Sequence, residues 1–202
     1  MKRAALGLAA VAIAFPAAAR ANGDPASDVI PGNEIFVTFA VSPTADEAAV
    51  LRKVTDETKK GGLPIRAAVI YQVGDLGTVG SLWRQPQAYA KFLDSEITFA
   101  YKGTLVVSMP NGFGVAGPGA TAAAKRALAK LPRPKGDAKA LVLATATAVA
   151  RVAGANGKAV SVPRLHSGGG LPTPAVAGIV AGGLLVVAAA GFLAVRRWLL
   201  SP

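Results

Sequence analysis

The chain has 202 residues, no cysteine and a formal net charge of +11. The lack of cysteine excludes disulfides, thiolate catalysis and Cys-based metal sites. Residues 23–157 hold 15 Lys and Arg against all 11 Asp and Glu, a net of +4, so the remaining positive charge flanks two hydrophobic segments near the termini. Charges placed there are typical of membrane-topology determinants, which removes the main argument for a nucleic-acid partner.

Residues 1–21 have the order of a secretory signal peptide. Two basic residues precede an apolar stretch over residues 4–15, and a proline then precedes small residues. The small residues predict cleavage after Ala21, with cleavage after Ala19 or an uncleaved anchor as alternatives. Residues 22–33 are rich in Pro, Gly and Asp and predict an extended lead-in.

Residues 34–153 predict one α/β domain, because β-branched runs alternate with helical periodicity. A serine followed by proline predicts the start of the first helix, and a pair of glycines predicts its end. The first elements are therefore a strand over residues 34–41, a helix from Ser42-Pro43 to Gly61-Gly62, and a buried strand over residues 64–71.

A long loop over residues 73–86 is expected to follow the second strand. Loops at the carboxyl ends of strands hold ligands in α/β sheets, so Asp75 is the best-placed carboxylate of the chain. The alternative is that Asp75 forms local hydrogen bonds in a turn or caps a short turn.

A helix over residues 87–97 and a strand over residues 104–109 come next. The helix carries Asp94 and Glu96, which point in different directions at a spacing of two and match a cooperating acid pair poorly. Asn111-Gly112 then predicts a hairpin. Asp75, Asp94, Glu96 and Asn111 are the candidate ligand-binding residues; no residue is assigned to catalysis, to a metal or to a cofactor.

The glycines at positions 112, 114 and 117 give a literal GxGxxG, but Pro118-Gly119 intervenes where a dinucleotide-binding motif would open a helix. Two more helices are expected, over residues 120–131 and from an Asp137 cap to residue 152. They carry a basic cluster that fits either a solvated face or a contact with anionic lipid or wall polymer. Its members are Lys125, Arg126, Lys130, Arg133, Lys135 and Lys139.

The predicted fold is a small three-layer-like α/β domain. Its central mixed sheet has about four strands flanked by about four helices, with an N-terminal signal helix and one C-terminal transmembrane helix added.

Residues 154–174 are expected to form a flexible linker that contains the single histidine. Residues 175–195 form an apolar run that is about 31 Å long as a helix, long enough to span a bilayer. The run, from Ala175 to Val195, contains no ionisable side chain, which excludes an ion path within it. Gly178 and Gly182 have the spacing of a weak homodimer contact.

Arg196 and Arg197 follow the run directly, and the positive-inside rule places them, with the short tail of residues 196–202, in the cytoplasm. The domain is then extracytoplasmic, held at the membrane by a single pass.

The strand Gly103-Thr104-Leu105-Val106-Val107-Ser108-Met109-Pro110, running into Gly112-Phe113-Gly114-Val115-Ala116-Gly117, resembles the TPM-domain family over residues 28–154. This resemblance implies a small exported α/β domain, in some members an acid phosphatase or a binder of divalent ions through acidic residues. Lys102 and Ala116 occupy positions where that family commonly has acids, so no catalytic residue is carried over.

The sequence therefore predicts a non-enzymatic binding or assembly module that contacts the bilayer and another membrane or cell-envelope protein. One alternative is a TPM-type phosphatase-like hydrolase that uses Asp75, Asp94 or Glu96. The other is a cell-wall-sorted protein, because Leu171-Pro172-Thr173-Pro174 before the apolar run resembles a sorting signal, although Thr173 is third and no glycine follows.

Overall fold

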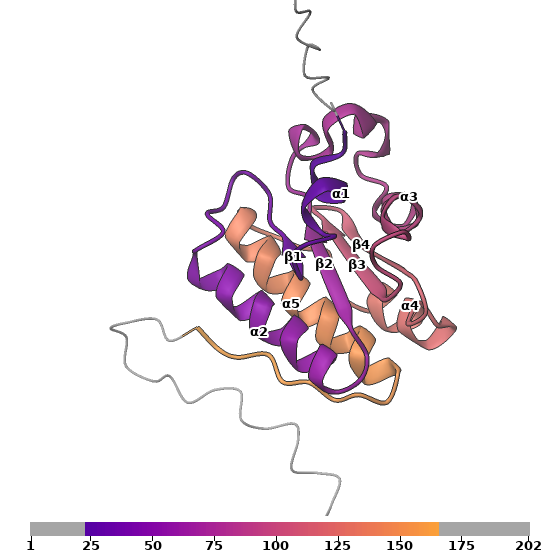
Figure 1. Ribbon diagram of the computed structural model, residues 1–202. Helices are drawn as coiled ribbons and strands as arrows, with labels where there is room; N and C mark the ends of the chain where they lie inside the picture. Colours follow the sequence, from indigo (N-terminus) through magenta and orange to yellow (C-terminus); the bar gives the residue numbers. More distant parts are fainter. Residues whose placement is uncertain (1–22, 166–202) are drawn as a thin grey trace, which may run out of the picture. The chain divides into compact units, whose positions relative to one another are not determined.

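The computed structural model describes residues 23–165 (Figure 1). The predicted signal peptide with Ala21, the span over residues 175–195, and Arg196 and Arg197 lie outside the described residues. The elements in chain order are α1 (Pro25–Val29), β1 (Ile35–Phe36), α2 (Asp46–Lys60), β2 (Ile65–Val69), the 3₁₀ segment η1 (Val73–Leu82), α3 (Pro86–Ile97), β3 (Thr104–Met109), β4 (Gly112–Ala116), α4 (Ala122–Ala129) and α5 (Ala138–Ala155).

The sheet has four strands in the order β1-β2-β3-β4. The first three strands are parallel, with Ile35 opposite Ala67 and Ala67 opposite Val106, and β4 returns antiparallel to β3 with Val115 opposite Val106. The predicted mixed sheet and the hairpin after β3 are thus confirmed. Parallel strands share a carboxyl edge, where the loops after β1, β2 and β3 meet.

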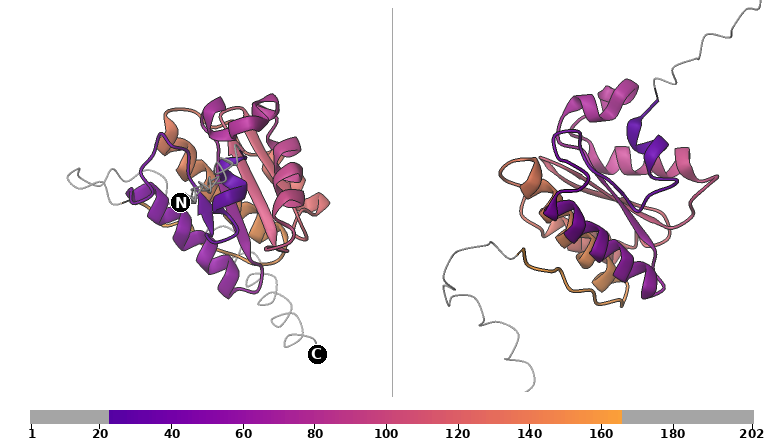
Figure 2. Two further views of the ribbon diagram at one scale, coloured as in Figure 1. Left: turned by 45° about the horizontal axis from the view of Figure 1, so that its top comes forward. Right: turned by 60° about the vertical axis from the view of Figure 1, so that its left-hand side comes forward.

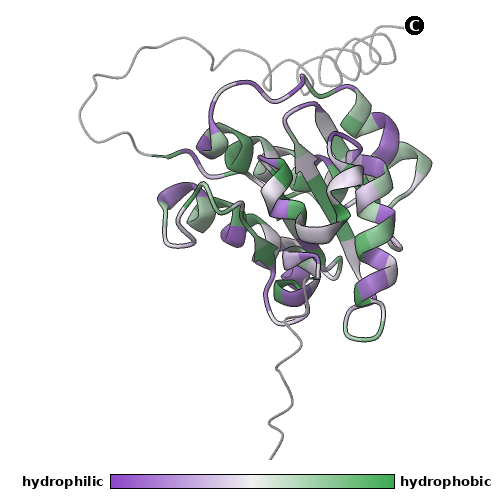
Figure 3. Ribbon diagram, turned by 90° about the horizontal axis from the view of Figure 1, so that it is seen from above, coloured by the Kyte–Doolittle hydropathy of each residue, from purple (hydrophilic) through white to green (hydrophobic). Residues whose placement is uncertain are grey.

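Helices cover both faces of this sheet (Figures 2 and 3). Because side chains alternate along a strand, Ala67 and Val69 join the core beneath α2, α4 and α5, whereas Ala68 and Ile70 join the core beneath α1, η1 and α3. The sheet is therefore buried on both sides, as its apolar strands predict.

Helix α5 is the central helix of the first core. It is long and apolar enough to cross a membrane by length and composition, and no other helix within residues 23–165 is. Its Leu141, Val142, Val149 and Val152 are buried against α2, α4 and the sheet. Its apolar character is therefore explained by packing.

The predicted cap of α5 is confirmed, since Asp137 Oδ1 accepts a hydrogen bond from Ala140 N at 2.9 Å. The predicted cap of α2 is wrong. Helix α2 begins at Asp46 after Ala45, and the Ser42 hydroxyl lies 2.8 Å from that of Thr44 in the preceding turn. The first strand is also shorter than the predicted residues 34–41, because the chain turns at Thr38, whose carbonyl accepts from Val41 N.

The prediction of an extended lead-in over residues 22–33 is wrong in part, because residues 25–29 form α1. Asp24 is the N-cap of this helix and Pro25 its first residue, which is a favourable helix start. Ala26 and Ile30 are fully buried in the second core. Burial of these two side chains stabilises the short helix.

The prediction that the linker begins at residue 154 is also wrong. Helix α5 continues to Ala155, and Val160, Val162 and Leu165 pack against the first core. The domain therefore extends through residue 165.

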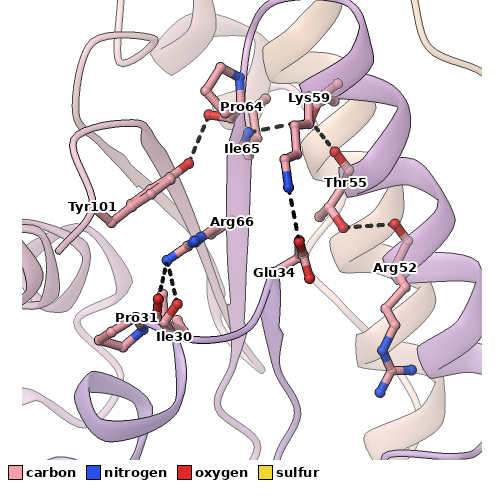
Figure 4. A network of polar contacts seen from close by, with 11 residues as sticks. Ile30, Pro31, Glu34, Arg52, Thr55, Lys59, Pro64, Ile65, Arg66 and Tyr101 are labelled. Atoms are coloured by element: carbon pink, nitrogen blue, oxygen red, sulfur yellow. Dashed lines mark hydrogen bonds and ion pairs between the residues drawn. The ribbon is translucent and has the colours of Figure 1, made fainter.

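A polar network ties α1 to the sheet (Figure 4). The Arg66 guanidinium donates to the carbonyls of Ile30 and Pro31, at 2.5 and 3.2 Å, and lies 4.1 Å from the centroid of the Tyr101 ring. The Tyr101 hydroxyl shares its one proton between the carbonyls of Pro64, at 2.8 Å, and Thr104, at 3.1 Å, which lie at the amino ends of β2 and β3. Arg66 and Tyr101 thus fasten the amino edge of the sheet.

Candidate functional site

Asp75 lies at the carboxyl edge of the sheet, fully buried at the start of η1. Its Oδ2 accepts from Tyr71 N at 2.8 Å and Gln72 N at 3.0 Å, and its Oδ1 accepts from Phe39 N at 3.2 Å. The carboxylate therefore joins the loop after β1 to the loop after β2. Tyr71 and Gln72 are local turn donors, which is the alternative that the sequence left open for Asp75, whereas Phe39 lies 36 residues away in the chain.

Asp94 and Glu96 lie on α3, and Glu96 is exposed. Burial raises the pKa of Asp94. Burial is also the main reason why the pKa of Tyr101 is raised to about 12, and the negative charge of Asp94 adds to that effect. Asp94 lies in the last turn of α3, just before the segment that carries Tyr101 to the amino ends of β2 and β3, so it lies toward that edge, away from Asp75.

Asn111 lies in the turn between β3 and β4. Its Nδ2 donates to the Arg84 carbonyl at 2.6 Å, and its buried Oδ1 has no hydrogen-bond partner among residues 23–165. The turn borders a hollow of about 280 Å³ at the start of α3 and beside α4. Of the four candidate residues, Asn111 alone lies in the wall of one of the three main cavities found within residues 23–165.

The structure does not bring the four candidate residues together. Asp75 is engaged at one edge, Asp94 lies near the other, and Glu96 faces solvent. Within residues 23–165, no three His, Cys, Asp or Glu side chains gather closely enough to hold a metal ion. Asp75, Asp94 and Glu96 are therefore not arranged as a pair of carboxylates that could act together in catalysis.

The structure contains a buried pair, Asp24 and Tyr89, that was not predicted from the sequence. The Tyr89 hydroxyl donates to Asp24 Oδ1 at 2.5 Å, and Asp24 Oδ2 is buried with no partner in the described part of the chain. Burial raises the pKa of Asp24 although the bond from Tyr89 opposes this, and burial beside Asp24 and Asp75 raises the pKa of Tyr89. Asp24-Pro25 was the available signal, since an N-cap aspartate before proline starts a helix.

Relative to the wild type, the Asp24→Asn variant is expected to gain free energy of unfolding as the pH rises. The folded-state pKa of Asp24 is raised above its ordinary 3.8, so ionisation of this side chain costs stability as the pH rises through the interval between the two values. Asparagine keeps an oxygen for the Tyr89 hydroxyl and carries no charge. Urea unfolding of both proteins from about pH 3 to about pH 7 should give a difference, variant minus wild type, that grows with pH. A difference independent of pH would contradict this account.

Strand β1 lies at the edge of the sheet, with α1 and α2 near it (Figure 1). A second cavity is lined by residues of α1, β1, the loop after β1 and α2. This groove, called here the β1 groove, has a volume of about 370 Å³ and no acidic side chain in its wall. Its apolar wall includes Val29, Val37, Phe39 and Val41, and its one charged residue is Arg52.

The β1 groove carries two of the exposed large apolar side chains of the described domain. Phe39 is 67% exposed and Val29 is 37% exposed, and Phe39 packs edge-to-face on the buried Phe36 with ring centroids 5.8 Å apart. The Asp75 carboxylate accepts from the backbone N–H of Phe39, so the loop that presents this aromatic ring is fixed in place.

Comparisons with protein-family models, with curated proteins and with solved structures found no match to this chain. The resemblance to the TPM-domain family therefore remains a hypothesis drawn from the sequence.

Proposed function

We propose that this chain is a membrane-tethered, extracytoplasmic binding module that receives an extended segment of another cell-envelope protein along β1. Its signal peptide and single span are predicted from residues 1–21 and 175–195. The observation that carries the binding role is the β1 groove, an apolar hollow beside an unpaired edge strand.

The backbone of β1 favours a strand as the occupant. Ala67 N donates to the Glu34 carbonyl at 3.0 Å, which sets the register of the parallel ladder with β2. Since alternate residues of a strand direct their backbone groups to opposite sides, Ile35 directs its N–H and C=O groups away from β2. An added strand would pair with these groups.

The side chains around the groove narrow the chemistry of that strand. The wall carries apolar side chains from α1, through Val29, and from the loop between β1 and α2, through Phe39 and Val41, so apolar side chains of the partner would be buried there. The Arg52 guanidinium donates to the Pro43 carbonyl at 2.8 Å and has no ion pair with a carboxylate within residues 23–165. An apolar extended segment with one acidic residue therefore complements the groove in shape and charge.

A binding role is better supported than the alternative of a TPM-type hydrolase. Hydrolysis needs a carboxylate free to act as base, acid or ligand, whereas both oxygens of Asp75 accept backbone hydrogen bonds. Asp94 and Glu96 lie on α3, and no shared cleft with Asp75 is found among the described cavities.

A photo-crosslinking side chain at position 39 of the full chain in native membranes tests this proposal. We expect a discrete adduct whose linked peptide is an apolar segment of a second envelope protein. The matched control places the same group at position 99, where Phe99 is 83% exposed but is not part of the groove wall.

Adducts at both positions, or at neither, would contradict the proposal, and an adduct with a second copy of the chain would replace the heterologous partner by self-association. Arg52→Met should weaken the adduct at position 39, because it removes the only charge in the wall of the groove.

A further inference from the structure

Helix α4 forms a basic ridge with a hollow on each of two adjacent sides. The first hollow, about 280 Å³, has Lys125 and Arg133 in its wall, and the second, about 330 Å³, has Arg126, Lys130 and Arg151. Leu131 belongs to both walls. These five cations and the two hollows are called here the α4 ridge.

We propose that the α4 ridge docks on an anionic lipid surface, with phospholipid headgroups entering the two hollows. This inference rests on the membrane tether of the proposed function, and it adds a second, electrostatic contact with the bilayer.

The positive charge of the ridge is uncompensated. Residues 97–165 contain ten Lys and Arg but only one acid, Asp137, and residues 97–136 contain no acid at all. Among residues 23–165, the ion pairs are Lys59 with Glu34 and Lys139 with Glu47, so no carboxylate pairs with the five cations of the ridge. Acids line neither hollow.

The arrangement favours a surface over one small anion. Lys125 and Arg126 are sequence neighbours on α4 and point about 100° apart, so their charges serve different hollows. Each hollow also has an apolar wall, formed by Phe113, Leu128 and Leu131 in the first and by alanines with Leu131 in the second. Cations above apolar wall residues match phosphate groups that lie above glycerol and acyl carbons.

The test uses the absence of cysteine from the chain. A polarity-sensitive fluorophore is attached to the full chain at Ala123→Cys, an exposed position in the wall of the second hollow, or at Ala49→Cys, an exposed position on α2. Each labelled protein is reconstituted in nanodiscs of phosphatidylcholine, with or without phosphatidylglycerol. We expect phosphatidylglycerol to shift the emission of the label at position 123 to the blue, high salt to reverse the shift, and the label at position 49 to stay unchanged.

Removing ridge charges should weaken docking. Each cation near an anionic bilayer changes the ratio of docked to undocked molecules about fivefold, so Lys125→Met with Lys130→Met should lower it about 25-fold. The matched control is Lys53→Met with Lys60→Met, which removes two exposed cations of α2 and should have little effect. If both double variants lost docking equally, docking would depend on the net charge of the domain and not on the α4 ridge, and the proposal would be wrong.

Two failures are distinguishable. If the chain resists alkaline extraction but the label at position 123 does not respond to phosphatidylglycerol, the ridge proposal is wrong and the tether stands. If alkaline treatment releases the chain, the tether itself is wrong.

Discussion

Asp75→Ala is expected to lower the free energy of unfolding by about 3–5 kcal/mol, because it leaves three partly buried backbone N–H groups without their charged acceptor. The loops after β1 and β2 would then separate, and the Phe39 ring would lose its fixed position. Urea unfolding of the full chain in a non-ionic detergent, followed by circular dichroism, measures this loss.

Asp94→Ala is the matched control for this experiment, because Asp94 is only partly buried and its side chain has no hydrogen bond among those found in the described domain. It should change stability by less than about 1 kcal/mol. A stable Asp75→Ala protein that loses a phosphomonoesterase activity of the wild type would contradict the structural role and support the hydrolase alternative.

Gly114→Ala is expected to destabilise the domain by about 2–4 kcal/mol. A Cβ atom at Gly114 would overlap the Pro86 carbonyl and lie 2.7 Å from the Cα atom of Gln87. Both are backbone atoms at the start of α3, where the Gln87 side chain also exchanges hydrogen bonds with the backbone of Val115. The helix would have to move away from β4, and thermal unfolding should show a lowered midpoint.

Gly154→Ala gives the opposite expectation and serves as the control. Gly154 lies inside α5, and a Cβ atom there would meet nothing within 4 Å. Alanine should therefore stabilise the protein by about 0.5–1 kcal/mol, through lower chain entropy in the unfolded state. If both substitutions shifted the midpoint in the same direction, close packing at Gly114 would not be the reason for the first effect.

The elements with strong local signals could be predicted from the sequence. Strand β3 has the predicted bounds, the hairpin follows at Asn111-Gly112, and Asp137 caps α5. Local signals were insufficient where tertiary contacts determine the secondary structure. The turn at Thr38 ends β1 early, and residues expected as a loop form η1 around the Asp75 carboxylate.

The candidate site was less predictable than the fold. The position of Asp75 at the carboxyl edge follows from the strand pattern, but its engagement with Phe39 N crosses 36 residues and has no local signal. The β1 groove depends on which strand lies at the edge of the sheet, and strand order cannot be read from strand content alone. The basic cluster was visible in the sequence, whereas its division between two hollows required the position of α4 against the hairpin and α5.

The packed segment before residue 166 bears on how the domain would respond to mechanical force. Val160, Val162 and Leu165 pack on the first core, beyond the end of α5. A pull applied at Leu165 would load these apolar contacts in succession, so they would give way one at a time before force reached α5. Breaking such contacts one at a time needs less force than shearing a whole helix out of the core, so the segment would lengthen under load while the sheet and the β1 groove stayed intact.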